Sequence, residues 1–411
     1  AQHRVAADLQ QLLGSPESTG RPGGEDRGVQ SVAGGVVHGA SLPAALQEAT
    51  VTKTEIEGFP CVTTRFDAAS RRGASVRVSD LKRVVEVQAW KVHKFGGSSV
   101  ADAACMERVA KIIEADPATR KGVVLSACMR VSDALLGLVA LAEKDDPAVD
   151  DRLEDVRQRH VTLAKALLAG ELYDDYVVAL DRDCRDIAGI LQTVRLVRSA
   201  STTMRDLISG YGEIWSTRAF ERLLRRRGLS AGHVQWVDAR KALLVEWGPM
   251  GPGIRWEQSR ANLQAMVAPD FVGTLVITGF IATDIHGLQT TLGRNGSDFS
   301  ASIFGSLLDA AEIIIWTDVD GVLSADPRLV PEAQVIDQLS YNEAMELAYF
   351  GAKVIHPSTM APAVQKRIPI WIKNTFAAEK AGTLIHDRTA PDPLVKGITT
   401  IDKIALVNLE G

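Results

Sequence analysis

The sequence predicts an α/β protein whose mostly parallel sheet is covered by helices on both faces. Strand-like and helix-like segments alternate between residues 90 and 144, and further strand-like runs recur up to residue 373. A stretch from about 147 to 200 keeps helical periodicity throughout. Together these observations predict the α/β class.

The composition favours a globular protein with a small-molecule partner. The 411 residues are 46% hydrophobic and 24% charged, with room for two or three domains. The net charge of −5 gives no electrostatic footprint of a nucleic-acid binder. The most apolar run, Phe271–Ala282, is shorter than the roughly 20 residues of a membrane-spanning helix, so we expect a soluble protein. Four scattered cysteines indicate neither a disulfide scaffold nor a zinc site.

The organised pattern begins with a strand over Trp90–Phe95, which leads into a Gly-Gly-Ser-Ser turn. Asp102 then caps a helix, a second strand covers 122–126, and a second helix covers 133–144. Two long helices standing off the sheet account for 147–200. Further strands are predicted at 233–238, 273–279, 312–316 and 369–373, and further helices at 213–227, 297–308, 342–349 and 359–367.

Three regions of the chain differ in composition. Residues 1–48 are rich in Gly, Ser, Pro and Gln and predict a mobile leader, and the transitional residues that follow complete a region at 1–88. The organised domain covers 89–385. Residues 386–411 hold a Pro-containing linker and a run too short to be a domain, so both ends look cut from a longer protein.

The first candidate ligand site is Lys94-Phe95-Gly96-Gly97-Ser98-Ser99, which joins a strand to a helix. Two glycines let the backbone approach an anion, N–H groups of the turn point at it, and Lys94 adds a positive charge. A Gly-Gly turn beside a solvated lysine explains the same residues equally well. Because neither G-x-x-x-x-G-K-[ST] nor G-x-G-x-x-G occurs, any phosphoryl chemistry must use another scaffold.

The second candidate is Thr290–Asp298, a polar, glycine-rich loop that opens a helix. Arg294 offers a planar fork that matches a carboxylate or phosphate, and Ser297 is the predicted N-cap. Asp298 is either a site residue or only a partner of the helix dipole. Glu213 also starts a helix, and combined with Arg294 it would bind the amino and carboxylate groups of an amino acid.

Carboxylates and cations also follow the buried strand at 312–316. Asp318 and Asp320 stand at its carboxyl end, where open α/β sheets bind ligands, and would contact a nucleotide or Mg²⁺. The alternative is a tight turn in which Asp caps its own backbone. Arg328 and Lys353 add positive charge nearby in the sequence. Two charged runs are interpreted as solvated helix ends: Arg225–Arg227 and Glu143–Asp146.

Seven motifs occur in one order along residues 90–385, and together they resemble aspartate kinase. They are K-F-G-G-S-S at 94–99, V-L-S-A at 124–127 with V-S-D-A-L-L at 131–136, G-E-I-W-S at 212–216, T-T-L-G-R-N-G-S-D at 290–298, W-T-D-V-D-G at 316–321, D-P-R at 326–328 and G-A-K-V-I-H-P at 351–357. The sequence is most similar to the kinase module of the plant-type bifunctional aspartokinase–homoserine dehydrogenase, a plastid enzyme.

The resemblance implies the amino-acid-kinase fold, a carbamate-kinase-like three-layer α/β/α arrangement, over a catalytic domain at 89–385. An N-lobe at about 89–270 would bind aspartate and a C-lobe at about 271–385 would bind MgATP. The implied reaction is the ATP-dependent phosphorylation of the β-carboxylate of L-aspartate, the first step toward lysine, threonine, methionine and isoleucine. By motif, the catalytic residues are Lys94, Gly97 and Asp298, the aspartate-binding residues Ser132, Glu213, Arg294 and Ser297, and the ATP-binding residues Lys94, Gly96, Gly97, Ser98, Thr317, Asp318, Arg328 and Lys353.

This reaction suits the residues at hand. The β-carboxylate has an ordinary pKa of about 3.9 and is ionised at neutral pH, so it needs no general base. The enzyme must supply charge neutralisation and in-line positioning, which Lys, Arg and backbone N–H groups provide. ATP and Mg²⁺ are the implied cofactors, with Mg²⁺ held mainly through the ATP phosphates and no protein ligand assigned to it.

The sequence departs from the family pattern at a few positions. Ser98 and Ser132 stand where Thr is usual and keep the hydroxyl, Asn295 replaces Gly or Asp, and Leu323 replaces a Tyr beside the nucleotide.

Two alternatives stay open: another carboxylate kinase, such as an acetylglutamate kinase, and a catalytically weak amino-acid or nucleotide sensor. The resemblance also implies a homo-oligomer formed through ACT regulatory domains, of which 386–411 holds only the start, and a location in the plastid stroma or otherwise the cytoplasm.

Overall fold

The computed structural model describes residues 50–56, 59–65, 89–229, 232–249, 251–349, 356–388 and 395–400. The chain divides into two compact units, Ala1–Arg77 and Val78–Gly411. The described part of the first unit is an antiparallel hairpin of β1 (Thr50–Ile56) and β2 (Phe59–Arg65). The segment predicted as transitional therefore contains two paired strands.

An eight-stranded sheet forms the centre of the second unit, in the order β12-β14-β13-β11-β3-β4-β8-β5. All neighbouring strands are parallel except β13 and β14. The α/β class and the mostly parallel sheet are confirmed. The strands are β3 (Trp90–Phe95), β4 (Arg120–Leu125), β5 (Val234–Val237), β8 (Gly273–Thr278), β11 (Glu312–Thr317), β12 (Gln338–Ser340), β13 (Ile370–Asn374) and β14 (Thr383–His386).

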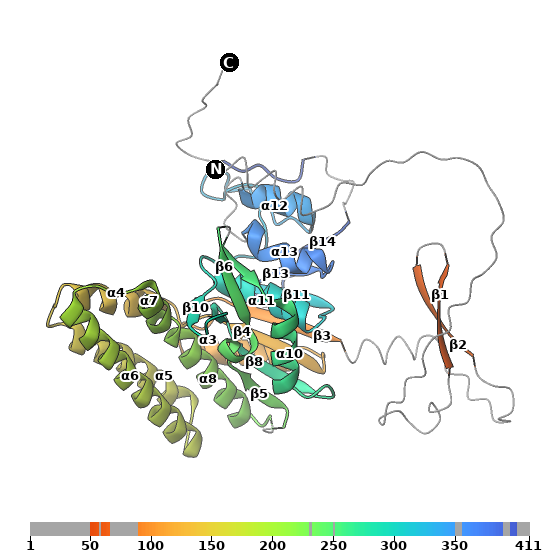
Figure 1. Ribbon diagram of the computed structural model, residues 1–411. Coiled ribbons are helices and arrows are strands. Elements are labelled where there is room, and N and C mark those ends of the chain that lie inside the picture. The colour runs from red at the N-terminus through yellow and green to blue at the C-terminus, as the bar shows by residue number, and fades with distance from the viewer. Residues whose placement is uncertain are drawn as a thin grey trace. The chain divides into compact units, whose positions relative to one another are not determined.

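Helices cover both faces of this sheet (Figure 1). Helix α11 packs on β3, β4 and β11 and contacts α10 and α13, whereas α8 packs on β5 and β8 from the other face and contacts α3. Arg227 at the end of α8 pairs with Glu107 and Glu114 of α3, so the arginine run is not simply solvated. These helices are α3 (Ala103–Ala115), α8 (Tyr211–Arg226), α10 (Trp256–Met266), α11 (Gly296–Leu307), α12 (Tyr341–Tyr349) and α13 (Pro357–Gln365).

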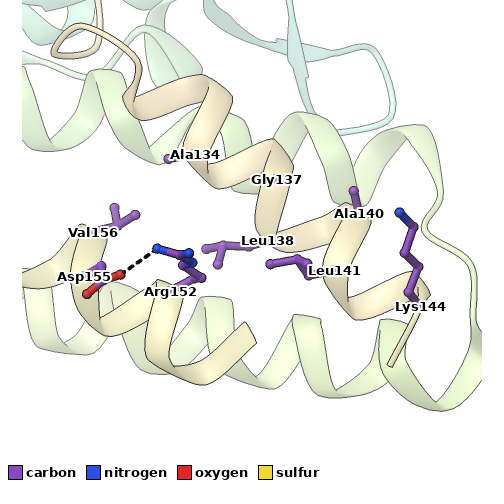
Figure 2. Close-up of a pocket in the computed structure, with 9 residues that line it drawn as sticks. All are labelled: Ala134, Gly137, Leu138, Ala140, Leu141, Lys144, Arg152, Asp155 and Val156. Atoms are coloured by element: carbon purple, nitrogen blue, oxygen red, sulfur yellow. Dashed lines mark hydrogen bonds and ion pairs between the residues drawn. The ribbon is translucent and has the colours of Figure 1, made fainter. Parts of the chain in front are cut away.

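A helical group stands beside the sheet, as predicted for 147–200 (Figure 1). It consists of α4 (Val131–Glu143), α5 (Val149–Leu167), α6 (Glu171–Val197) and α7 (Thr202–Ser209). Glu143, predicted to be solvated, accepts hydrogen bonds from the Ala200 N–H and from Arg205. A groove of about 450 Å³ lies where α4 and α5 face each other. Figure 2 shows Leu138 and Val156 among the side chains that line it.

A second, four-stranded sheet in the order β10-β9-β6-β7 was not predicted. Its strands are short, and two of them contain glycine, so they give little periodic signal. They are β6 (Leu244–Gly248), β7 (Gly251–Ile254), β9 (Ile281–Asp284) and β10 (Gln289–Thr291), and the short helix α9 (Ala239–Ala242) precedes them.

The C-terminal run does not begin with a strand. Residues 395–400 have no regular secondary structure, and 401–411 lie outside the described residues. The Ile398 N–H donates to the Ser324 carbonyl, and Lys396 pairs with Glu343 at 2.7 Å. Among the described helices, none is both long and apolar enough to cross a membrane.

Candidate functional site

A cleft of about 460 Å³ opens where β3 ends and where helices α4, α8 and α11 begin. Its lining includes residues that the sequence placed in separate motifs: Lys94, Gly96, Gly97, Ser132, Glu213, Arg294, Ser297 and Asp298. The structure therefore brings all the predicted catalytic and aspartate-binding residues into one cavity. Ser98 lies in the same turn, half-buried, but not in the lining.

Lys94 reaches across the cleft to α11. Its Nζ lies 2.7 Å from Oδ1 of Asp298, and the two side chains are only 12% and 14% exposed. Gly97 packs tightly against the segment after β4, because an added Cβ would lie 3.1 Å from the Ala127 carbonyl oxygen. The Met129 N–H also donates to the Gly97 carbonyl at 3.0 Å. Lys94 is thus a paired, mostly buried cation rather than the solvated lysine of the alternative reading.

Glu213 places a buried carboxyl group in the same cleft. Its side chain is 3% exposed, and Oε2 has no hydrogen-bond partner among the described residues. Burial raises the pKa of Glu213 to about 8, although a hydrogen bond from the Ala127 backbone opposes part of this shift. A buried carboxyl group without a cation is unfavourable, so this position suits a positively charged group supplied by a ligand.

Close packing of two helix starts brings Glu213 near Ser132. A Cβ on Gly212 would lie 2.7 Å from the Ala127 Cβ and 3.6 Å from the Ser132 Oγ. A residue with a side chain would therefore push the first turn of α8 away from α4. The absence of a side chain at 212 lets the first turns of both helices border the cleft.

The loop before α11 differs from its prediction in two respects. Asn295, at φ 55°, is the N-cap of α11, whereas Ser297 was predicted to be the cap and instead lies in the first turn. Ser297 packs against Gly279, whose added Cβ would lie 3.0 Å from its Oγ. Arg294 is exposed at the rim of the cleft, so it is not part of a buried pair within the chain.

Of the predicted ATP-binding residues of the C-lobe, Thr317, Asp318 and Arg328 lie outside this lining. Thr317 ends β11 and donates to the exposed Asp318 at 3.2 Å. Arg328 is 75% exposed and pairs with Asp326, two residues away, at 2.5 Å. Lys353 falls outside the described residues. The structure therefore does not bring Thr317, Asp318 or Arg328 into the cleft.

Sequence reasoning missed two residues that fix the glycine turn. The Ser99 and Thr375 hydroxyls lie 2.7 Å apart, both buried, and join the turn to the end of β13. Ser99 stands in a motif that was recognised, but Thr375 gives no local signal because 276 positions separate the two residues. No group of three or more His, Cys, Asp or Glu side chains suited to a metal ion occurs within the described part of the chain.

The chain is similar to several known proteins. The model of the amino acid kinase family matches residues 89–374. Bifunctional aspartokinase/homoserine dehydrogenase 1 of Zea mays is 39% identical over 78% of this chain, which spans only 35% of that relative's length. Lysine-sensitive aspartokinase 3 of Escherichia coli is 36% identical, with 75% of this chain and 66% of that protein covered. The crystal structure of E. coli aspartokinase III in complex with aspartate and ADP superposes with a TM-score of 0.66 at 32% identity, covering 75% of this chain and 66% of the other.

Proposed function

This chain belongs to the amino acid kinase family, and on that premise we propose that it transfers a phosphoryl group from ATP to the β-carboxylate of L-aspartate. The product is 4-phospho-L-aspartate, which starts the route to lysine, threonine, methionine and isoleucine. The observation that carries the proposal is the cleft in which the unpartnered Glu213 carboxyl and the Lys94–Asp298 pair occur together.

The roles follow from charge. Glu213 binds the substrate ammonium group, Arg294 at the rim binds its α-carboxylate, and the hydroxyls of Ser132 and Ser297 orient it. This leaves the β-carboxylate facing Lys94 and the N–H groups of the glycine turn, which neutralise the transferring phosphoryl group. Asp298 holds the Lys94 ammonium in place.

The nucleotide half of the proposal rests on the loop after β11. ATP would contact Gly96, Gly97 and Ser98 through its terminal phosphates and Thr317, Asp318, Arg328 and Lys353 through the remainder. Mg²⁺ would bind mainly to the ATP phosphates, where it shields their charge. Asp320 is already engaged by Lys380 at 2.6 Å and Asn374 at 2.7 Å, which favours Asp318 over Asp320 as a contact. The complex of E. coli aspartokinase III with aspartate and ADP supports this choice of ligands.

Domain boundaries and cell location complete the proposal. An N-lobe at about 89–270 would hold aspartate and a C-lobe at about 271–385 the nucleotide. The chloroplastic relatives from Zea mays, Arabidopsis thaliana and Daucus carota support a plastid location. Homo-oligomerisation through ACT domains stays a prediction.

Trapping the acyl phosphate with hydroxylamine tests the proposal. With ATP, Mg²⁺ and L-aspartate, the protein is expected to give the hydroxamate, and with N-acetyl-L-glutamate it is expected to give none, since that substrate lacks the ammonium group for Glu213. Hydroxamate from N-acetyl-L-glutamate alone would select the rival carboxylate kinase. Binding of ATP and aspartate without any hydroxamate would select the sensor.

A further inference from the structure

A second cavity, of about 520 Å³, lies on the opposite face of β3 from Lys94. Side chains alternate along a strand, so Lys94 points toward α11 while Lys91 points toward Asp116, the C-cap of α3. Helix α3 forms one wall of the cavity, and strands β3, β11 and β13 form most of the remainder. None of its lining residues belongs to the candidate cleft.

Two tryptophan rings and one lysine lie together in this cavity. Trp316 is 4% exposed and stacks on Phe95 with the ring centroids 5.7 Å apart, so it forms part of the floor. Trp371, on the neighbouring strand, is half-buried. The Nζ of Lys373 lies 5.7 Å from the Trp316 ring centroid and 5.9 Å from that of Trp371, within cation–π range of both.

The carboxylates of the cavity are already engaged. Lys91 pairs with Glu312 at 2.7 Å and with Asp116 at 3.0 Å. The Trp371 indole N–H also donates to Glu312, at 3.1 Å. Neither carboxylate is therefore left to pair with Lys373.

Three further cations of the lining form no ion pair with a carboxylate of the described residues. Within the described part of the chain, no ion pair forms to Arg108, Lys111 or Lys373. The Arg108 guanidinium instead lies 4.9 Å from the Phe376 ring centroid. With four cations and two carboxylates in its lining, the cavity carries a formal excess of two positive charges.

We propose that this cavity is a binding site for a small molecule that joins a planar aromatic ring to a phosphate group, such as a nucleoside monophosphate. The ring would stack on Trp371, and the phosphate would bind Lys373 together with Arg108 or Lys111. A phosphate monoester carries a charge of about −1.5 to −2 at neutral pH, which matches the excess positive charge of the lining better than the single negative charge of a carboxylate does. The volume also falls within the range of about 300–1,000 Å³ typical of small-molecule sites.

The test uses the full chain and AMP as the probe, with adenosine as the ring-only control and ribose 5-phosphate as the phosphate-only control. By titration calorimetry, AMP is expected to bind, and each control at least about tenfold more weakly, since each lacks one set of contacts. Lys373→Gln and Arg108→Gln, which lie on different elements, should each weaken AMP binding by about tenfold. Lys165→Gln, an exposed lysine of α5, is the matched control and should leave it unchanged.

Circular dichroism melting curves establish that each variant is folded. No AMP binding by the folded protein, or full-strength binding by both Lys373→Gln and Arg108→Gln, overturns the proposal. Adenosine binding as tight as that of AMP overturns the phosphate contact. The inference does not rest on the proposed function: loss of AMP binding with hydroxamate formation intact, or the reverse, separates the two.

Discussion

The candidate cleft and the loop after β11 hold their predicted ligand-binding groups in different environments. In the cleft, Lys94 and Asp298 form a mostly buried pair and Glu213 is 3% exposed. In the loop, Asp318 is exposed, and Arg328 is 75% exposed with its ion-pair partner only two residues away. The predicted groups of the cleft are thus buried by packing, whereas Asp318 and Arg328 stand at the surface.

The difference shows which groups are preorganised. Ser132 and Glu213 lie in the first turns of α4 and α8, which pack against each other near Gly212, and Lys94 is held by its pair with Asp298. These groups are therefore positioned before any ligand binds. Preorganised charges contribute most to a transition state. Exposed ion pairs contribute only about 0–1 kcal/mol and leave their members free to exchange partners. We therefore expect large effects from the cleft and small ones from the loop.

The largest effect is expected from Lys94→Ala. Because Lys94 would meet charge that develops on the transferring phosphoryl group, kcat and kcat/KM should fall together by about 10²–10³. The ATP KM should change little. Steady-state hydroxamate assays measure this, with the exposed Lys241 of α9 changed to Ala as the control. If a folded Lys94→Ala protein keeps more than about a tenth of kcat, substitution in the cleft affects catalysis no more than substitution in the loop, which would contradict this expectation.

Arg294→Ala is expected to raise the aspartate KM and leave the ATP KM unchanged. Because Arg294 is exposed, the expected effect is that of one charged hydrogen bond, about 1.5–3 kcal/mol or roughly 10–100-fold. Since exposed charges are screened, the effect should weaken as salt rises. If neither KM moves, Arg294 is not the carboxylate clamp.

Glu213 should make aspartate binding depend on pH. With its pKa raised to about 8, the carboxyl is protonated at neutral pH in the free protein and must lose that proton to bind an ammonium group. The aspartate KM should therefore fall as pH rises toward 8, by up to about tenfold per pH unit. Glu213→Gln should raise the aspartate KM and abolish this dependence. Glu221→Gln, on the same helix but outside the cleft, should keep it.

The same group affects stability in the opposite direction. The folded protein holds the Glu213 proton more tightly than the unfolded chain, whose Glu has the ordinary pKa of 4.5. Glu213 therefore makes its full contribution to the free energy of unfolding below pH 4.5, and this contribution is lost as pH rises through about 8. In denaturant unfolding, the free energy of unfolding of Glu213→Gln should rise relative to that of the unchanged protein as pH increases from 4.5 to about 8. A constant difference between the two proteins would mean that the carboxyl is not buried as described.

The smallest effect is expected from Arg328→Ala. Because its partner Asp326 lies two residues away on an exposed loop, losing that pair should cost under about 1 kcal/mol. If Arg328 contacts the nucleotide, the ATP KM should rise a few-fold and the aspartate KM should stay constant. If Arg328→Ala raised the aspartate KM as much as Arg294→Ala does, the cleft and the loop would not differ in the ligand they bind.

Local patterns predicted the parts of the molecule that depend on local sequence. The apolar run of β11, the glycine turn after β3 and the helix that begins near Glu213 all carry their own signals, so six strands of the main sheet and the members of the cleft were predictable. The two short strands β12 and β14 of the same sheet were not predicted. Even so, neither the cap of α11 nor the exposure of Arg294 was anticipated. Both depend on the backbone of one loop, in which Asn295 takes a positive φ of 55°.

Contacts between distant segments gave no such signal. The Ser99–Thr375 bond joins residues 276 positions apart, and β6 pairs with the distant β9 to build the small sheet. The cavity behind β3 also required the register that sets Trp316 beside Lys373. Spacing along the chain does not encode which strands become neighbours, so these features needed the folded structure.

The central claim is that the cleft phosphorylates the carboxylate of a free amino acid whose ammonium group Glu213 binds. The most direct measurement compares hydroxamate formation from L-aspartate and from N-acetyl-L-aspartate, with ATP and Mg²⁺, in the full chain. The two substrates share the reacting β-carboxylate and differ in the ammonium group. A rate at least about tenfold greater with aspartate, as expected for one lost charge-assisted contact, is the predicted result. Equal rates with both substrates would contradict it.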